Sequence, residues 1–474
     1  MVPEIRLTAE WVAAAVAGTI VEGDSRRVFA GVSIDTRTLG AGALYFGIRG
    51  ERFDGADFAD AAVAGGAAGL ILPRERARIA MAGRGGVGQV STPVTIGVDD
   101  TTVALQALAH AVRVESGAKV AAIIGSAGKT TTKEVTAEFL GAKYRVIRNR
   151  GNFNNHIGLP LSLMELTARP DVAVVELGMN HAGEISTLVR IAEPDVRVWT
   201  NVGDSHVGFL GSEDAIADAK AEILEGATSA TVLVANADDD RIAARTSPFA
   251  GRVVTFGIDR PADVRAEAVV DRGINGMTAR VQTPSGAVDL ATPLLGRGNL
   301  SNVLAAIAVG VEWEVSLAAM AERASRLKPA PHRGEVVRLA QGVILIDDSY
   351  NASPAATRRA LDVLRDGAGR RVAVLGEMLE LGDQSIALHE DIGRAAAAAH
   401  VDLLIAVGGE ASRALVDAAV GGGLLPARTR HLATAEEAAD ASAALIQPGD
   451  LVLVKGSHSI RTDRVVDRLK TVFG

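Results

Sequence analysis

The sequence predicts an α/β fold built from three domains. Its 474 residues are too many for one ordinary hydrophobic core. Short apolar runs rich in β-branched residues alternate with helical patterns, which is typical of parallel sheets covered by helices. We expect a small N-terminal α/β module over residues 1–100, a central P-loop-type parallel sheet with an antiparallel ribbon over 101–328, and a C-terminal doubly wound, Rossmann-like domain over 329–474.

Composition limits the class of protein. Lys and Arg total 49 against 57 Asp and Glu, the net charge is −8, and aromatic residues make up only 3%. These values argue against a nucleic-acid partner. The chain has no cysteine, which excludes disulfides, cysteine nucleophiles and thiolate-bound zinc. Without a bilayer-length apolar run or a signal-peptide pattern, we expect a cytoplasmic protein with no stable membrane insertion.

The N-terminal module contains two expected strands, Leu44–Ile48 and Gly69–Leu72, around a helical pattern at Phe58–Val63. Polar residues follow an expected strand end at Asp35, Thr36 and Arg37. Such groups at a strand end suit a ligand, but composition alone favours a solvated turn.

The central domain contains the most informative segment. An apolar strand over 120–124 runs into Gly125, Ser126, Ala127, Gly128, Lys129, Thr130 and Thr131, and helix formers follow. Glycines let several backbone N–H groups face one anion, and the helix N-terminus adds its positive dipole end. Lys129 would reach terminal phosphates, and the Thr130 hydroxyl suits Mg²⁺. Although Ile123 stands where a standard P-loop begins with glycine, we expect a nucleoside triphosphate here rather than an ordinary turn.

Further polar groups follow central strands. Amides cluster at Asn152, Asn154 and Asn155, where a structural loop and a ligand contact are about equally expected. Glu176 ends an apolar strand, and His206 follows the expected strand Arg197–Val202. A single residue of this kind is ordinarily capping or solvated, but because both follow strand ends at the carboxyl edge of a parallel sheet, we expect these two to ligate Mg²⁺.

The remaining segments complete the order of elements. Lys220 reads as a surface lysine from its neighbours alone, and Arg265–Leu295 has the pattern of an antiparallel ribbon. Asn299 enters an Ala-rich helix, first as an N-cap candidate and second as a base contact. Two prolines near Lys328 mark a boundary. Beyond it, strands alternate with helices at Val343–Ile346, Val372–Leu375, Leu403–Val407 and Leu451–Val454.

Seven segments together resemble the Mur ligases, the ATP-dependent amide-forming enzymes of peptidoglycan synthesis. They are DTRTLGAGALYFGIRGERFDG, GNFNNHIGLPLSL, ELGMNHAGEI, TNVGDSHVGFLGSEDAIADAKAEI, DDSYNASPAATRRAL, LGEMLELG and LVLVKGS. The resemblance covers nearly the whole chain, and the joint order and spacing of the segments are highly specific. The short glycine loop is the form that this family uses.

The resemblance implies a role for individual residues. The ATP-binding set is Gly125 to Thr131 with Asn299, Arg333 and Asp347. The substrate set is Thr36 and Arg37 for the UDP group, with Asn154 and Asn155 for the muramoyl-peptide. The set for two expected Mg²⁺ ions is Thr130, Glu176, His206 and a carbamylated Lys220, and the catalytic set is Lys129, Glu176, His206 and Lys220. Three positions depart from the family pattern, namely Gly298 for His, Ser353 for Asn and His332 for Gly.

The resemblance also implies a reaction. A monomeric enzyme of cell-wall biogenesis, cell shape and cell division would join D-alanyl-D-alanine to a UDP-N-acetylmuramoyl-tripeptide through an acyl phosphate, releasing ADP and phosphate. A sister ligase that adds a single amino acid, or a folylpolyglutamate synthetase, would share the ATP site. A nucleotide-dependent switch or binding protein would form no amide, and the set Glu176, His206, Lys220 and Asp347 argues against it.

Overall fold

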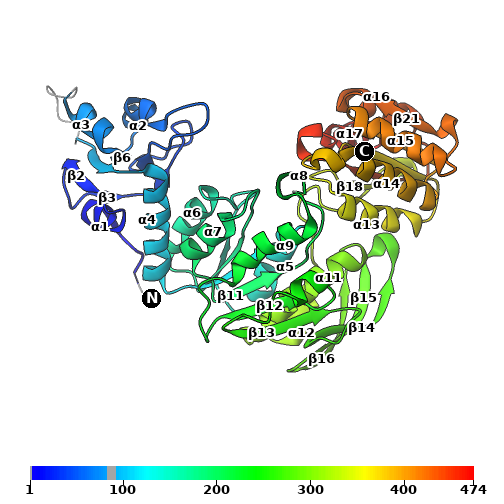
Figure 1. The fold of residues 1–474 in the computed structure, drawn as a ribbon, viewed down its shortest axis with the longest axis horizontal. Coiled ribbons are helices and arrows are strands. Elements are labelled where there is room, and N and C mark those ends of the chain that lie inside the picture. Colours follow the sequence, from blue (N-terminus) through cyan, green and yellow to red (C-terminus); the bar gives the residue numbers. More distant parts are fainter. Residues whose placement is uncertain (1–2, 83–91, 206) are drawn as a thin grey trace. The chain divides into compact units, whose positions relative to one another are not determined.

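A computed structural model describes residues 3–82, 92–205 and 207–474 (Figure 1). His206, predicted above as a metal ligand, lies outside the described residues. The chain forms two compact units, one of residues 1–122, 144–179 and 183–195 and one of residues 123–143, 180–182 and 196–474. Within the described parts, no helix combines the length and the apolar character needed to cross a membrane. The predicted domain boundaries at residues 100 and 328 stay a prediction.

The first unit begins with a five-stranded sheet of order β2-β7-β6-β5-β4, in which β4 to β7 are parallel and β2 is antiparallel to β7. The strands are β2 (Thr19–Glu22), β4 (Val32–Ser33), β5 (Leu44–Phe46), β6 (Gly69–Pro73) and β7 (Val94–Val98), and the helices are α1 (Ala9–Ala15), α2 (Ala59–Ala64) and α3 (Arg74–Ala82). β1 (Leu7–Thr8) pairs with β3 (Val28–Phe29). The predicted N-terminal α/β module is confirmed.

The first unit continues with α4 (Thr101–Ser116), β9 (Val146–Arg148), α6 (Gly158–Leu163), β10 (Val172–Glu176) and α7 (Glu184–Ala192). The α4 helix begins at residue 101 because the Asp100 carboxylate accepts hydrogen bonds from the backbone N–H groups of Thr102 and Val103, at 2.7 and 2.9 Å. It ends before Gly117, which has left-handed backbone angles. Strands β9 and β10 are parallel.

A nine-stranded sheet has the order β16-β15-β14-β13-β12-β11-β8-β10-β9. Its strands in addition to β9 and β10 are β8 (Lys119–Ile124), β11 (Val196–Trp199), β12 (Val232–Asn236), β13 (Arg252–Gly257), β14 (Val264–Asp271), β15 (Met277–Thr283) and β16 (Gly286–Thr292). β11 to β14 are parallel neighbours, whereas β15 and β16 are antiparallel, which confirms the predicted ribbon. The strand predicted to reach Val202 ends at Trp199, and residues 200–205 form a loop.

The second unit carries its helices between and after these strands. They are α5 (Lys129–Leu140), α8 (Val207–Leu210), α9 (Glu213–Ala221), α10 (Asp240–Ala243), α11 (Gly296–Glu312) and α12 (Leu317–Ala324). α11 is the long helix that packs along α5, and its residues from Val303 to Val309 are buried.

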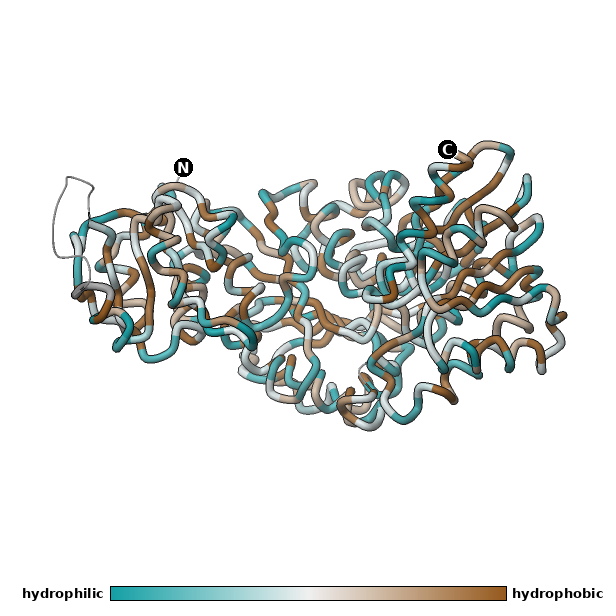
Figure 2. Tube along the Cα trace, turned by 90° about the horizontal axis from the view of Figure 1, so that it is seen from above, coloured by the Kyte–Doolittle hydropathy of each residue, from teal (hydrophilic) through white to brown (hydrophobic). Residues whose placement is uncertain are grey.

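The C-terminal part of the second unit is a six-stranded sheet of order β17-β18-β22-β19-β20-β21, parallel except for β17. Its elements are β17 (Glu335–Arg338), β18 (Ile344–Asp348), α13 (Pro354–Arg365), β19 (Arg371–Gly376), α14 (Ser385–Ala398), β20 (Leu403–Val407), α15 (Glu410–Gly421), β21 (Thr429–Leu432), α16 (Ala435–Leu445), β22 (Leu451–Lys455) and α17 (Asp463–Phe473). The inner strands are buried and hydrophobic (Figure 2). The predicted doubly wound, Rossmann-like arrangement is confirmed.

Candidate active site

The glycine loop leads from β8 into α5, as predicted. Gly125 has φ 152° and Gly128 has φ 81°, which residues with a Cβ rarely adopt. Space is also lacking, because a Cβ on Gly125 would overlap the Thr200 hydroxyl and one on Gly128 would overlap the Asn302 amide. The two glycines therefore allow a tight turn in direct contact with two other segments of the second unit.

The segment after β11 holds this loop in shape. The Ala127 N–H donates to Asn201 Oδ1 at 2.9 Å, and Asn201 Nδ2 donates back to the Ala127 carbonyl at 2.8 Å. The Thr200 hydroxyl donates to the same carbonyl at 3.0 Å, and the Ser126 hydroxyl donates to the Gly203 carbonyl at 3.1 Å. Thr200 and Asn201 were not predicted as site residues, although their place directly after an apolar strand was a usable signal.

The start of α5 carries positive charge. Gly128 is the N-cap, no acidic residue lies in the first turn, and Lys129 is the first helical residue. Lys129 Nζ donates to the Gly125 carbonyl at 2.8 Å, so the ammonium lies over the loop. The exposed N–H groups of a helix start, its dipole and an ammonium together suit a phosphate chain. Thr130 follows in the same turn and offers a hydroxyl oxygen, a donor of the type that Mg²⁺ takes.

Lys220 is buried, so the expectation of a surface lysine from its neighbours alone was wrong. It is 2% exposed, near the end of α9. Burial lowers its pKa well below the ordinary value because a charged ammonium is costly away from water, and the charge of Lys129 lowers it further. An unprotonated amine is nucleophilic, which is the state needed for reaction with carbon dioxide.

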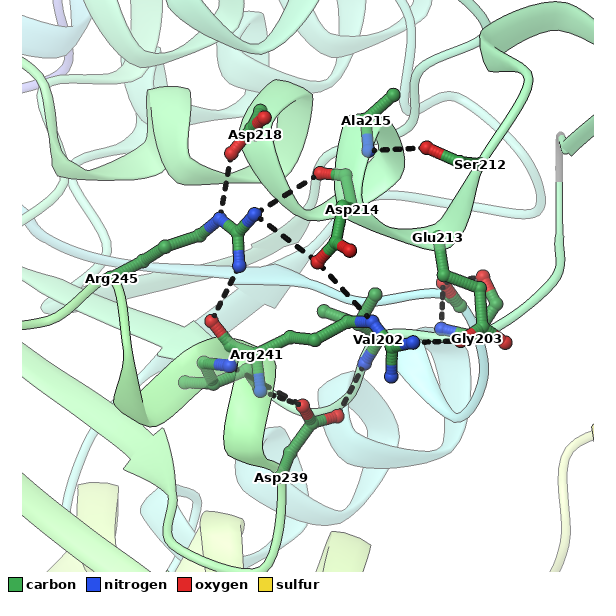
Figure 3. A network of polar contacts seen from close by, with 12 residues as sticks. Val202, Gly203, Ser212, Glu213, Asp214, Ala215, Asp218, Asp239, Arg241 and Arg245 are labelled. Carbon is green, nitrogen blue, oxygen red and sulfur yellow. Dashed lines mark hydrogen bonds and ion pairs between the residues drawn. The ribbon is translucent and has the colours of Figure 1, made fainter.

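Polar contacts connect α9 and the loop after β11 to α10 and to the residues at its two ends (Figure 3). Arg245 Nε donates to Asp218 Oδ1 of α9 at 2.7 Å. Asp239 Oδ2 accepts from the Val202 N–H at 2.7 Å, while its Oδ1 caps α10 by accepting from the Arg241 N–H at 3.1 Å. The charged side of α9 is thus held by arginines, and its opposite side carries the buried lysine inward.

Glu176 and Asn154 meet in the first unit. Glu176 is 3% exposed at the end of β10, and its Oε1 accepts from Asn154 Nδ2 at 2.7 Å. Asn149, which was not predicted, accepts from the Glu176 N–H at 3.0 Å. Asn155 Oδ1 instead accepts from the N–H groups of Ile157 and Gly158, so it caps the turn that starts α6. Within residues 3–82, 92–205 and 207–474, no three His, Asp or Glu side chains are grouped as a metal site.

A cavity of about 440 Å³ lies within the second unit. Its wall includes Ser126 to Gly128, the start of α11, and residues between β18 and the end of α13. Asn299 lines it but is not the N-cap, because α11 begins at Gly296 and Asn299 Nδ2 donates to the Leu295 carbonyl at 2.9 Å. Arg333 also lines it, with its guanidinium 4.1 Å from the centre of the Tyr350 ring.

The neighbouring residues Asp347 and Asp348 differ in whether their side chains line the cavity. Asp347 is fully buried and is not among the cavity-lining residues; its Oδ2 lies 2.9 Å from His332 Nδ1. Asp348 lines the cavity and accepts from Lys455 Nζ at 2.6 Å. Asp347 therefore supports the loop that carries Arg333, whereas Asp348 and Lys455, which were not among the predicted site residues, line the cavity.

A second cavity, of about 640 Å³, lies within the first unit. Its wall includes Asp35 and Thr38 from the N-terminal part and Arg150 from the segment after β9. Thr36 and Arg37, the predicted contacts, are not among the lining residues. Arg37 pairs with the Asp35 carboxylate at 2.6 Å and lowers the pKa of Asp35 to about 2. The predicted segment borders the cavity, although the contributing side chains are its neighbours.

Comparison with known proteins defines the class. The chain matches the Mur ligase family, catalytic domain, over residues 28–129, the Mur ligase middle domain over 123–310, and the Mur ligase, glutamate ligase domain over 332–458. The chain belongs to the Mur ligase family and is a ligase, which confirms the resemblance found in the sequence.

Several individual members of the family are similar to this chain over nearly its whole length. The chain is 36% identical to the UDP-N-acetylmuramoyl-tripeptide–D-alanyl-D-alanine ligase of Escherichia coli, over 93% of each chain. It is similar to a crystal structure of MurF from Acinetobacter baumannii, with a TM-score of 0.87 and 30% identity over 99% of this chain and 100% of that one. It is also similar to the MurF ligase of Thermotoga maritima in complex with ADP, with a TM-score of 0.79 and 26% identity over 93% and 97% of the two chains.

Proposed function

We propose that this ligase uses ATP to join D-alanyl-D-alanine to a UDP-N-acetylmuramoyl-tripeptide, giving the pentapeptide precursor of peptidoglycan. The observation that carries the proposal is the glycine loop and helix start, which border a cavity large enough for part of a nucleotide. The substrate classes come from the name of the E. coli relative, whose likeness extends over both chains.

The chemistry explains why such a loop is required. A carboxylate is a poor electrophile, and phosphorylation turns it into an acyl phosphate that the amine of D-alanyl-D-alanine can attack. The carboxylate and the phosphate chain are both anions, so cationic groups must lower their repulsion. Lys129 and the N–H groups of the first turn of α5 bind and orient the phosphates. The cavity walls limit the access of water to the reacting groups.

Lys220 supports the proposed carbamate. The nitrogen of its neutral amine forms a bond to the carbon of carbon dioxide and loses a proton, so that an uncharged group becomes an anionic oxygen donor. The low pKa that burial and Lys129 impose favours the amine that reacts. The carbamate and the Thr130 hydroxyl are hard oxygen donors, which fit Mg²⁺. Glu176 and His206 remain the predicted further ligands for two ions, which would neutralise the reacting phosphates when bound.

The cavity of the first unit is the proposed site for the UDP-sugar. It offers backbone groups around Gly31 and Gly40, the hydroxyls of Ser33 and Thr38, and the cation of Arg150. These groups are of the kinds that bind a uracil, a ribose and a diphosphate. We further propose a monomer acting in the cytoplasm, in support of cell shape and division. This proposal agrees with the absence of cysteine and with the function named for the relatives.

The test is a product assay. Purified protein is incubated with ATP, Mg²⁺ and each UDP-muramoyl-tripeptide, containing either meso-diaminopimelate or lysine, and the products are identified by mass spectrometry. We expect amide product and phosphate release with D-alanyl-D-alanine and neither with single amino acids. Amide formation with a single amino acid would instead identify a sister ligase. ATP hydrolysis without any amide would identify a nucleotide switch and overturn the proposal.

A further inference from the structure

Among the described residues, five cationic side chains line the cavity of the second unit, and most of them are already neutralised. Three are paired with carboxylates, namely Arg297 with Asp259 at 2.5 Å, Arg365 with Asp362 at 2.8 Å and Lys455 with Asp348 at 2.6 Å. Arg333 has its guanidinium over the Tyr350 ring. The fifth, Arg359 in the middle of α13, has neither arrangement.

Arg359 has its guanidinium free among the described residues. It is exposed at the cavity wall, and no hydrogen bond or ion pair joins it to another described side chain. Although part of the side chain is open to solvent, burial of the guanidinium among neighbouring protein atoms lowers its pKa, while the charge of Asp204 opposes that shift. An arginine keeps its charge under such conditions because its ordinary pKa exceeds 12. The cavity therefore holds a fixed positive charge with no protein anion bonded to it.

Gly298 has no side chain, which leaves space for the Arg359 side chain beside α11. A Cβ on Gly298 would lie 3.0 Å from Arg359 Nη1 and 3.2 Å from its Cδ, which is tighter than an ordinary contact, so a side chain there would require the arginine to shift by a few tenths of an ångström. Gly298 does not have a positive φ, so its backbone conformation does not require glycine. Glycine at this position therefore leaves the Arg359 side chain in its present position without crowding.

The position along α11 indicates what the guanidinium can reach. Gly298 lies four residues before Asn302, which is one turn, or about 6 Å, along the same helix face. Asn302 contacts Gly128 of the glycine loop. Arg359 is thus about one helical turn from the glycine loop. A phosphate chain bound at this loop could extend far enough to reach its guanidinium. A guanidinium presents two parallel N–H donors that match phosphate oxygens.

We propose that Arg359 binds the phosphate chain of the nucleotide from the α13 side of the cavity, in the space that Gly298 leaves open. The inference rests on the proposed nucleotide site and adds a residue contributed by the C-terminal sheet region of the second unit. It makes α13 a nucleotide-binding element as well as a structural one.

The test measures ATP binding to full-length Arg359→Gln by calorimetry at several salt concentrations. We expect affinity to fall about tenfold to a hundredfold, the usual effect of losing a hydrogen-bonded charge. The salt dependence of binding should also weaken, because one screened charge pair is gone. The matched control is Arg358→Gln, whose arginine is the preceding residue but pairs with Asp391 at 3.3 Å and does not line the cavity. The control should bind ATP like the wild type.

Gly298→Ala supplies a second, independent variant. Alanine favours a helix more than glycine does, so folding should be unharmed. Its Cβ should crowd Arg359 and shift the guanidinium, and so weaken ATP binding in the wild-type background but not in Arg359→Gln. Such coupling would not arise if the arginine had only a structural role.

The outcomes separate this inference from the proposed function. ATP affinity of Arg359→Gln equal to that of Arg358→Gln would overturn the inference alone, provided that the wild type binds ATP and Lys129→Ala does not. Reduced affinity with unchanged salt dependence would also overturn it and point to the base instead. Failure of the wild type to bind ATP would overturn the nucleotide site itself.

Discussion

Replacing Asn201 with alanine should loosen the glycine loop. The Asn201 amide makes two hydrogen bonds to the backbone of Ala127, one through each polar atom, at 2.9 and 2.8 Å. A hydrogen bond contributes about 1 kcal/mol net, and an unsatisfied partner adds to the loss. Because Ala127 is only half-buried, water can replace part of what is lost. We therefore expect Asn201→Ala to reduce the free energy of unfolding by about 2 kcal/mol.

ATP binding should weaken more than stability does. The loop must hold its N–H groups in place before it binds phosphate, and an unrestrained loop pays that ordering cost on binding. Urea denaturation measures the first effect and calorimetric ATP titration the second. Asn201→Asp is the matched variant, because it keeps the acceptor for the Ala127 N–H but sets a carboxylate oxygen against the Ala127 carbonyl. Unchanged ATP affinity in both variants would refute the argument that this amide shapes the loop.

Three further changes test other parts of the structure. Gly128→Ala should abolish ATP binding, as seen by calorimetry, because the new Cβ overlaps the Asn302 amide at a left-handed φ of 81°; retained affinity would contradict the loop geometry. Lys220→Ala should lose ligase activity and regain part of it with added short carboxylates, whereas full activity without rescue would rule out the carbamate. His389 is fully buried and its pKa is lowered, chiefly by burial. Its unfolded form therefore takes up a proton first as pH falls below about 6.5, and the free energy of unfolding should drop by up to about 1.4 kcal/mol per pH unit there. Urea denaturation at pH 7.5 and 5.5 should show a smaller drop in the free energy of unfolding for His389→Gln than for the wild type. An equal drop in both proteins would show that other groups cause the pH dependence.

The parts of the site that the sequence predicted are those made by neighbours in the chain. The run from Gly125 to Thr131 specifies a strand, a turn and a helix start by local preference alone, and the structure has all three. Asn201 was missed because its partner Ala127 is 74 residues away, and only the pairing of strands brings the two together. Lys220 was misjudged for a similar reason: its sequence neighbours include Asp218 and Glu222, and only the orientation of α9 buries it.

The pair Asp347 and Asp348 shows where local patterns stop being informative. Successive residues of a strand face opposite sides of the sheet, so one aspartate of the pair had to point away from the cavity. The sequence DDSYN does not indicate which of the two aspartates faces the cavity. That depends on how β18 packs against the neighbouring strands. In the structure Asp347 is buried against His332, whose neighbour Arg333 lines the cavity. In the proposed nucleotide site, Asp347 would therefore act through the placement of Arg333, while the charge facing the nucleotide directly would be that of Asp348, which is already balanced by Lys455. A net positive field in this cavity must then come from the cations without such a partner, Arg333 and Arg359.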